Sequence, residues 1–176
     1  TTVAVYIERE CGRAVRGGVG EAKCGGNYAA ALPSLIKARK LGADQVLWLD
    51  GVEQKYVEEV GAMNVMFVYG DTIVTPKLSG SILPGITRDS LIQLARHLGY
   101  QVREEKVLVD DLILDIQRGN VTEIFGCGTA AVVSPIGELI SDKGRVVIGN
   151  GEVGEVSRKL KNTLIGIQVG SHEDPF

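Results

Sequence analysis

Apolar runs bounded by turn-forming residues predict two buried strands in the first fifty positions, at Val3–Ile7 and Gln45–Leu49. Between them, helical spacing of apolar residues predicts a helix over 28–41, which ends at Gly42 as a C-cap. Pro33 lies inside this helix. Because proline lacks a backbone N–H and its ring clashes with the preceding turn, we expect a kink or a fresh helix start there.

Further along the chain, the period of the pattern changes several times. Strands over Asn64–Tyr69 and 72–75 flank Gly70-Asp71 and predict a hairpin, and 87–98 has helical spacing. The remaining segments are predicted as a half-exposed strand at 101–108, a short helix at 109–119, strands at 121–125, 131–140 and 145–148, and a closing helix at 155–169. Since strands and helices mix without a strict βαβ rhythm, an α+β domain is favoured over a doubly wound sheet.

Composition narrows the class of protein. The 176 residues suit one domain, and a net charge of -3 gives no general attraction for nucleic acid or membrane surfaces. No apolar run approaches the roughly 20 residues that span a bilayer. Three cysteines without ligand spacing and two histidines argue against a metal site and indicate a reduced, cytoplasmic setting. Thr1 enters a strand directly, without an initiator methionine, so we expect a fragment of a longer protein, and an organellar location stays open.

A glycine-rich segment at 18–28 surrounds a single lysine, Lys23, and ends in Gly-Gly-Asn-Tyr. Glycine allows close approach of the main chain to a ligand, and a lysine held in such a turn can act as a nucleophile or base. A tight turn with a solvated lysine is the structural alternative.

Three further segments carry candidate chemistry. The octet 57–64 places Glu58 and Glu59 next to small residues, although a solvated turn is an alternative. The segment 83–89 precedes a helix whose first turn offers free N–H groups to an anion; Thr87 can be its N-cap, and simple capping is the alternative. The segment 125–131 has two glycines between apolar strands and forms either an anion-binding turn or a structural one. Together, a lysine, an acid, a tyrosine and two anion-binding turns match the requirements of a pyridoxal phosphate site.

With these residues identified, the chain resembles the branched-chain aminotransferases of the class IV pyridoxal phosphate family. The resemblance rests on four ordered motifs: Gly-x-Gly-x-x-Lys-x-Gly-Gly-Asn-Tyr at 18–28, Glu-Glu-Val-Gly-x-Met-Asn at 58–64, Leu-Pro-Gly-Ile-Thr-Arg at 83–88 and Gly-x-Gly-Thr-Ala at 126–130. It implies the D-amino-acid-aminotransferase-like fold (pyridoxal phosphate fold type IV), with a mixed sheet or pseudo-barrel and flanking helices. It also implies pyridoxal 5'-phosphate as cofactor and no metal.

The resemblance assigns roles around the cofactor ring. Lys23 would form the Schiff base and shuttle the proton between Cα and the cofactor. Glu59 would hold the pyridine nitrogen protonated, and Tyr28 would hydrogen-bond the phenolic oxygen. Arg13 would support the cofactor from behind these residues.

The same resemblance assigns the two anions of the reaction. The main-chain amides of Ile86 and Thr87, with Thr129, would hold the cofactor phosphate. The amides of Thr129 and Ala130 would bind the substrate carboxylate. The substrate side chain would be bordered by two small residues, Gly61 and Ala62.

The chain also departs from the family pattern. Family members are roughly twice as long, so residues 1–176 are expected to be the cofactor-binding C-terminal half of a two-domain enzyme. Where some relatives carry a redox Cys-x-x-Cys, this chain has Ala131 and Ser134, so no such switch is expected. Cys24 and Cys127 are interpreted as small packing residues, and Glu58 as a solvated neighbour of the site.

The expected activity is transamination of leucine, isoleucine or valine with 2-oxoglutarate in branched-chain amino acid biosynthesis, by a full-length enzyme that is a homodimer. The partners are small amino and 2-oxo acids, with no nucleic acid or membrane. Three alternatives stay open: an aminodeoxychorismate lyase or a D-amino acid aminotransferase of the same fold, or a non-catalytic isolated domain.

Overall fold

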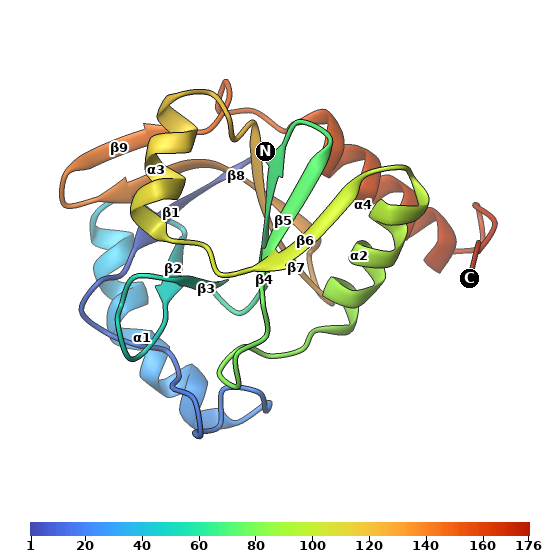
Figure 1. The fold of residues 1–176 in the computed structure, drawn as a ribbon. Coiled ribbons are helices and arrows are strands. Elements are labelled where there is room, and N and C mark those ends of the chain that lie inside the picture. The colour runs from blue at the N-terminus through green and yellow to red at the C-terminus, as the bar shows by residue number, and fades with distance from the viewer.

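A single curled sheet with four surrounding helices forms the backbone of residues 1–176, all of which are described by a computed structural model (Figure 1). The strands are β1 (Val3–Ile7), β2 (Gln45–Leu49), β3 (Val57–Val60), β4 (Asn64–Tyr69), β5 (Thr72–Pro76), β6 (Gln101–Glu105), β7 (Glu123–Gly128), β8 (Val132–Ser141) and β9 (Gly144–Val147). The helices are α1 (Gly25–Lys40), α2 (Ile86–His97), α3 (Val109–Gln117) and α4 (Glu155–Gln168).

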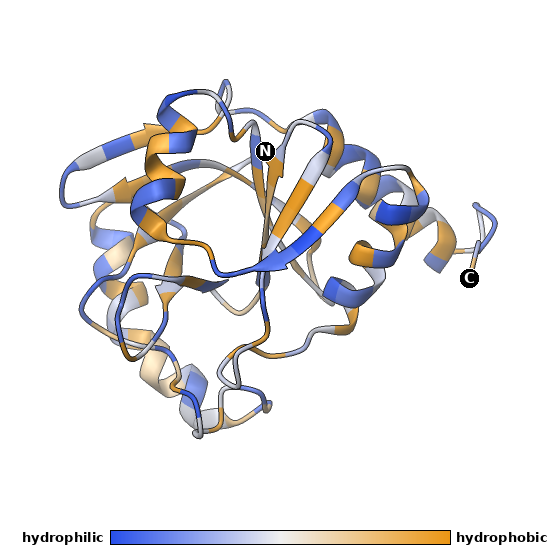
Figure 2. Ribbon diagram, viewed as in Figure 1, coloured by the Kyte–Doolittle hydropathy of each residue, from blue (hydrophilic) through white to orange (hydrophobic).

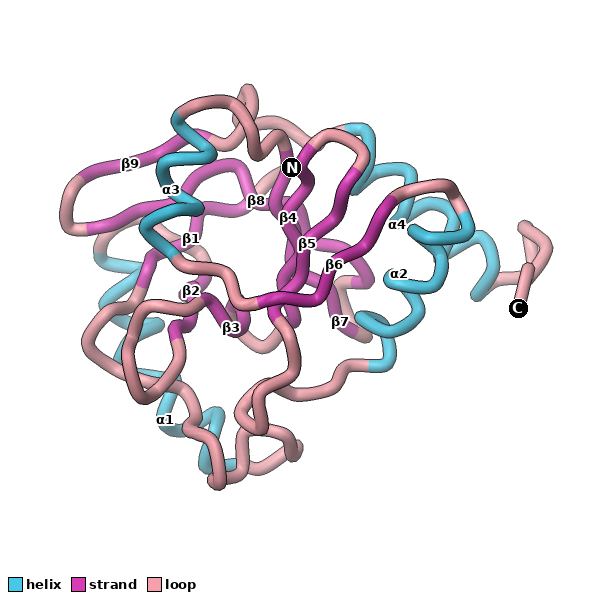
Figure 3. The backbone as a smooth tube through the Cα atoms, in the orientation of Figure 1, coloured by secondary structure: helices cyan, strands magenta, loops and turns pink.

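The sheet is mixed, as the sequence predicts. Its strand order is β3-β2-β1-β8-β7-β4-β5-β6, with β9 paired to β8. β1 runs parallel to both β2 and β8, and β5 runs parallel to β6, whereas the other pairs are antiparallel. Figure 3 shows the strands curving around a common centre, which agrees with the expected pseudo-barrel.

Three apolar clusters hold the helices on this sheet. The largest contains eighteen buried residues from the sheet, α3 and the adjoining loops, and includes Val5, Leu47 and Phe67. A second lies under α2 and α4, and a third packs α1 against Tyr6 and Trp48. Figure 2 shows hydrophobic stretches along the strands and along one side of the helices. Burying each large apolar side chain stabilises the fold by about 1.5–3 kcal/mol, so these clusters hold the helices against the sheet.

Two possibilities left open by the pattern, a fresh helix start at Pro33 and a solvated turn at 57–64, are not what the structure shows. Helix α1 starts at Gly25 and continues through Pro33, so no new helix begins at the proline. Because Pro33 has no N–H, the carbonyl of Ala29 lacks its helical hydrogen bond. Both residues are exposed, so water can donate to this carbonyl instead. Residues 57–60 form strand β3 with all four residues buried, in place of a solvated turn. None of the four helices combines the length and apolarity needed to cross a membrane.

Candidate active site

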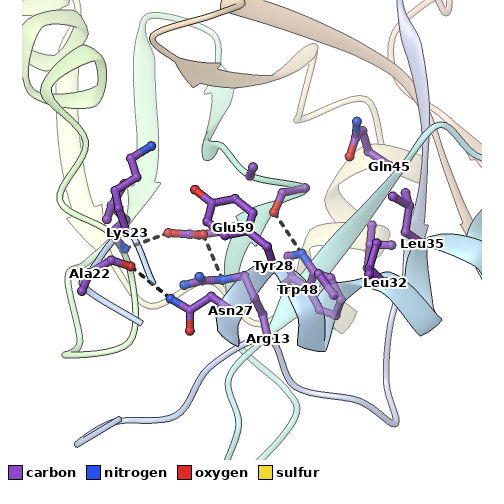
Figure 4. A pocket seen from close by; sticks show the side chains of 15 residues that line it. Arg13, Ala22, Lys23, Asn27, Tyr28, Leu32, Leu35, Gln45, Trp48 and Glu59 are labelled. Carbon is purple, nitrogen blue, oxygen red and sulfur yellow. Dashed lines mark hydrogen bonds and ion pairs between the residues drawn. The ribbon is translucent and has the colours of Figure 1, made fainter. Parts of the chain in front are cut away.

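A cavity of about 200 Å³ opens between the loop before α1, helix α1 and the edge of the sheet at β2 and β3 (Figure 4). Six of the site residues expected from the sequence lie in its wall: Arg13, Lys23, Tyr28, Glu59, Gly61 and Ala62. The remaining lining residues are Ala22, Asn27, Ala31, Leu32, Leu35, Gln45, Val46, Trp48 and Leu83. The structure therefore brings the predicted lysine and the predicted acid to one cavity.

Lys23 lies in the loop just before α1, and Asn27 gives that loop its shape. The Nδ2 atom of Asn27 donates to the carbonyl oxygens of Val19 and Ala22, at 2.8 and 3.0 Å. The Asn27 side chain is buried, whereas Lys23 is exposed and has no ion-pair partner. A buried amide thus ties Asn27, on one side of Lys23, to Val19 and Ala22 on the other, while the Lys23 side chain remains exposed.

Glu59 is the buried acid of the cavity, with only 3% of the residue exposed. Its Oε2 atom lies 3.0 Å from Nε of Arg13, and its Oε1 atom accepts the backbone N–H of Leu83 at 2.8 Å. Figure 4 shows the Arg13 and Glu59 side chains facing each other at the base of the cavity. Oε1 therefore has a hydrogen-bond donor, whereas Oε2 is compensated by the charge of the guanidinium, whose Nε makes no hydrogen bond.

Burial raises the pKa of Glu59 to about 7, although the Arg13 guanidinium and the Leu83 amide both favour the ionised form. The carboxyl group can therefore gain or lose a proton near neutral pH in this chain. A cation placed beside it in the cavity would favour its ionised form.

The turn that joins β3 to β4 forms another wall. Gly61 has a φ of 57°, in the left-handed region, and a Cβ there would collide with Oε1 of Gln45. The indole N–H of buried Trp48 donates to the Gly61 carbonyl at 3.1 Å. The left-handed backbone therefore favours glycine at position 61, and its neighbour Ala62 lies at the cavity edge.

The far side of the cavity is apolar. Ala31, Leu32 and Leu35 come from one side of α1, and Val46 and Trp48 face them from β2. Tyr28 stands at the start of this helical side, 49% exposed, between the apolar wall and Lys23. The cavity thus has a charged end and an apolar end, which suits a ligand that is charged at one end and apolar at the other.

The amides expected to bind phosphate lie outside the cavity wall, at the start of α2. The Asn64 Nδ2 atom donates to the Leu83 carbonyl at 2.8 Å, so Leu83 is held by Asn64 and Glu59 together. Gly85, not Thr87, is the N-cap of α2, and no side chain caps the helix. The prediction of a Thr87 cap was wrong because the backbone is already helical at Ile86. The first-turn N–H groups of α2, including those of Ile86 and Thr87, therefore remain available for an anion.

The second predicted anion-binding segment is the turn between β7 and β8. Gly128 pairs with Val132, which leaves Thr129 and Ala130 exposed at the tip. Asn64, which holds Leu83, pairs with Cys127 two residues before this tip. The turn and the α2 N-terminus are thus linked through Asn64.

Two other expectations can be compared with the structure. Cys127 is buried among apolar residues, and burial raises its thiol pKa to about 12, in agreement with a packing role. Glu58, expected to be solvated, is only 6% exposed, and its Oε1 atom accepts hydrogen bonds from Ser79 and Ser81. The expectation for Glu58 was wrong because residues 79–81 fold over the outer side of β3.

The residues that the sequence did not single out are mainly structural supports of the cavity. Asn27 belonged to a recognised motif, but its two hydrogen bonds join it to residues five and eight positions earlier. Trp48 and Gln45 lie in β2, and the apolar pattern of this strand does not indicate that their side chains contact Gly61 in the turn after β3. Their importance follows from tertiary contacts, which no local pattern encodes.

Comparison with known proteins gives three consistent results. The family model described as amino-transferase class IV matches residues 20–139. The chain is 56% identical over 170 residues to a probable branched-chain-amino-acid aminotransferase of Staphylococcus aureus (strain N315), covering 97% of this chain and 48% of the relative. It is 53% identical over 174 residues to branched-chain-amino-acid transaminase 1 of Bacillus subtilis (strain 168), covering 99% and 49%.

Solved structures agree with these relatives. The branched-chain amino acid aminotransferase from Escherichia coli has a TM-score of 0.83 at 30% identity, covering 99% of this chain and 55% of that one. The branched-chain aminotransferase from the thermophilic archaeon Thermoproteus uzoniensis, solved with norvaline, has a TM-score of 0.81 at 28% identity, covering 98% and 53%. The chain spans about half the length of the curated relatives it matches.

Proposed function

This chain belongs to the class IV aminotransferase family, and on that premise we propose that it binds pyridoxal 5'-phosphate between Lys23 and Glu59. As the cofactor-binding domain of a longer enzyme, it would serve to transfer the amino group of leucine, isoleucine or valine to 2-oxoglutarate. The observation that carries the proposal is the shared cavity of a free lysine and a buried glutamate. The names of the relatives support the branched-chain substrate.

The residues present fit the cofactor. A phosphorylated pyridine aldehyde needs an amine for its carbonyl, an acid for its ring nitrogen and N–H donors for its phosphate. Lys23 and Glu59 supply the first two from one cavity, and the uncapped first turn of α2 offers the third. When bound, the cofactor supplies an electron sink that makes the substrate Cα–H acidic.

Around the ring, each side chain has a distinct task in this proposal. Lys23 would hold the cofactor through its amine and would serve as the general base and acid for the proton at the substrate Cα. Glu59, ionised beside the ring nitrogen, keeps a proton on that nitrogen. Arg13 supports Glu59 from behind, and Tyr28 donates to the phenolic oxygen of the cofactor.

The cofactor phosphate, the substrate carboxylate and the substrate side chain are assigned to other parts of the site. The amides of Ile86 and Thr87, together with Thr129, bind the phosphate, and the amides of Thr129 and Ala130 bind the substrate carboxylate. A branched aliphatic side chain would border two small residues, Gly61 and Ala62. The aliphatic end of the cavity supports this assignment, because burying such a side chain there removes apolar area from water.

The proposal extends to the arrangement of the full-length protein, on the family resemblance alone. Residues 1–176 form one cofactor-binding domain of a two-domain enzyme, and that enzyme is a cytoplasmic homodimer. Sedimentation of the full-length protein tests the dimer.

The function is tested by a single-turnover experiment. The full-length enzyme that contains this chain is mixed with pyridoxal 5'-phosphate and then with L-leucine, and mass spectrometry follows the 2-oxo acid of leucine. Parallel samples receive D-leucine or aminodeoxychorismate, which separate the two same-fold alternatives. Release of pyruvate from aminodeoxychorismate, with no 2-oxo acid from L-leucine, would overturn the proposed substrate class. Cofactor attachment without either product would identify a non-catalytic domain.

A further inference from the structure

Two consecutive glutamates on β3 lie on opposite sides of the strand. Neighbouring side chains of a strand point to opposite faces. Glu59 lines the cavity with Lys23, whereas Glu58 lines a separate hollow with Ser79, Ser81 and Lys106. Only Glu59 has a role in the proposed function, so the buried Glu58 is unexplained.

Glu58 binds the segment that follows β5 and leads toward α2. Its Oε1 atom accepts the hydroxyl of Ser81 at 2.5 Å and that of Ser79 at 3.2 Å, and the two hydroxyl oxygens lie 2.9 Å apart. Ser81 is almost fully buried, at 2% exposed. Glu58 therefore fixes the position of Ser81 by a short, charge-assisted hydrogen bond.

Ser81 also contacts the cation that partners Glu59. Its carbonyl accepts Nη2 of Arg13 at 2.6 Å, while Nε of the same guanidinium lies 3.0 Å from Oε2 of Glu59. The other contact of Nη2, to the carbonyl of Gly20, is longer at 3.4 Å. Ser81 is thus the main support that holds the Arg13 fork in the orientation that meets Glu59.

We propose that Glu58 and Ser81 are positioning residues for the cofactor site: they hold Arg13 against Glu59 and thereby control the charge that Glu59 presents to the cavity. The role of Glu59 toward the cofactor rests on the proposed function, whereas the contacts among Glu58, Ser81, Arg13 and Glu59 are present in the chain itself. Through Ser81 and Arg13, a hydrogen bond of Glu58 on one face of β3 thus affects the charge of Glu59 on the other face.

Four charged or titratable groups surround Glu59, and their effects can be separated. Arg13 and Lys23 favour its ionised form, while the like charge of Glu58 opposes it. Cys127, on β7, is close enough for its own titration to be affected by Glu59. Changing Glu58 removes a charge directly. Changing Ser81 or Ser79 removes one hydroxyl that favours the ionised form of Glu58, so only the loss of positioning distinguishes the two serine variants.

The test is a carbon-13 NMR titration of the Glu59 carboxyl in the chain without cofactor, assigned with Glu59→Gln. Ser81→Ala is expected to raise the pKa of Glu59 by about one unit, because the guanidinium is no longer held beside it. Ser79→Ala is the matched control: it also removes a hydroxyl from Glu58, but no carbonyl of Ser79 binds Arg13. Equal titrations of Glu59 in the two variants would overturn the proposal.

A second pair of variants gives an independent answer if Ser81→Ala does not fold. Glu58→Gln and Glu58→Ala both lack the charge, but only glutamine keeps an oxygen for Ser81. We expect Glu59 to titrate about one unit higher in Glu58→Ala than in Glu58→Gln. Identical values would mean that Glu58 acts by charge alone and would refute the positioning role. Neither result depends on turnover, so it stands apart from any failure of the proposed activity.

Discussion

The Nε atom of Arg13 lies 3.0 Å from the Oε2 atom of Glu59, and both side chains are more than nine-tenths buried. The guanidinium reduces the cost of burying the carboxylate but does not remove it, so the pKa of Glu59 stays at about 7. The unfolded chain is expected to titrate near the ordinary value of 4.5. Glu59 therefore makes the stability of this fold depend on pH.

Glu59→Gln is expected to flatten that dependence. Between pH 4.5 and 7 the folded chain holds a proton that the unfolded chain releases, so the contribution of Glu59 to stability falls as pH rises through this window. Relative to the parent, the free energy of unfolding of Glu59→Gln should rise by about 3 kcal/mol from about pH 4.5 to about pH 8. Urea unfolding at several pH values measures the difference, and parallel pH profiles would contradict it.

Lys23→Ala is expected to abolish covalent capture of pyridoxal 5'-phosphate. After borohydride reduction, intact mass spectrometry should show the added cofactor on the parent and not on the variant. Lys40→Ala is the control, because Lys40 is an exposed lysine at the far end of α1. Equal labelling of Lys23→Ala and the parent would reject Lys23 as the attachment site.

Asn27→Ala is expected to destabilise the chain by about 1–3 kcal/mol, because two backbone carbonyls lose their donor. Cofactor capture should slow as well, since the loop that carries Lys23 is no longer fixed. Gln93→Ala removes an amide from the exposed surface of α2 and should change stability by less than about 0.5 kcal/mol. Similar urea midpoints for the two variants would argue against the structural role of Asn27.

Gly85→Ala is expected to weaken phosphate binding at the start of α2. The added methyl would collide with Oδ1 of Asn64, which must then move and release Leu83. We expect about a tenfold loss of affinity for pyridoxal 5'-phosphate, or about 1.4 kcal/mol, in a fluorescence titration. Gly25→Ala, whose methyl meets no atom within 4 Å, controls for a general effect on folding. Unchanged affinity in Gly85→Ala would place the phosphate elsewhere.

Local pattern was sufficient for most of the elements. The strands at Val3–Ile7 and Gln45–Leu49 have the predicted bounds, and the hairpin turns at Gly70, which has the positive φ such a turn needs. A fresh helix start at Pro33 was wrong because the cost of an interior proline depends on whether water reaches the freed carbonyl. That depends on the tertiary placement of the helix, which the pattern does not contain.

In the candidate site, too, local motifs predicted some residues, while others depend on tertiary contacts. Motif spacing identified Lys23 and Glu59, and the structure brings them to one cavity, while their roles remain predictions. Glu58 was misjudged because consecutive acids usually lie on a solvated surface, and its partners are more than twenty residues away. Leu83 was not identified as a contact of Glu59, since it acts through its backbone N–H, which every residue except proline has.

The parallel pairing of β1 with β8 joins residues that are far apart in the chain, such as Val5 and Leu139. The loop carrying Arg13 and Lys23 follows β1 directly, so we expect this loop to reach its final position only once β1 is paired. Contacts so distant in sequence are slow to form, because a long loop has to close first. After dilution from urea, cofactor capture should therefore recover later than the helical circular dichroism signal.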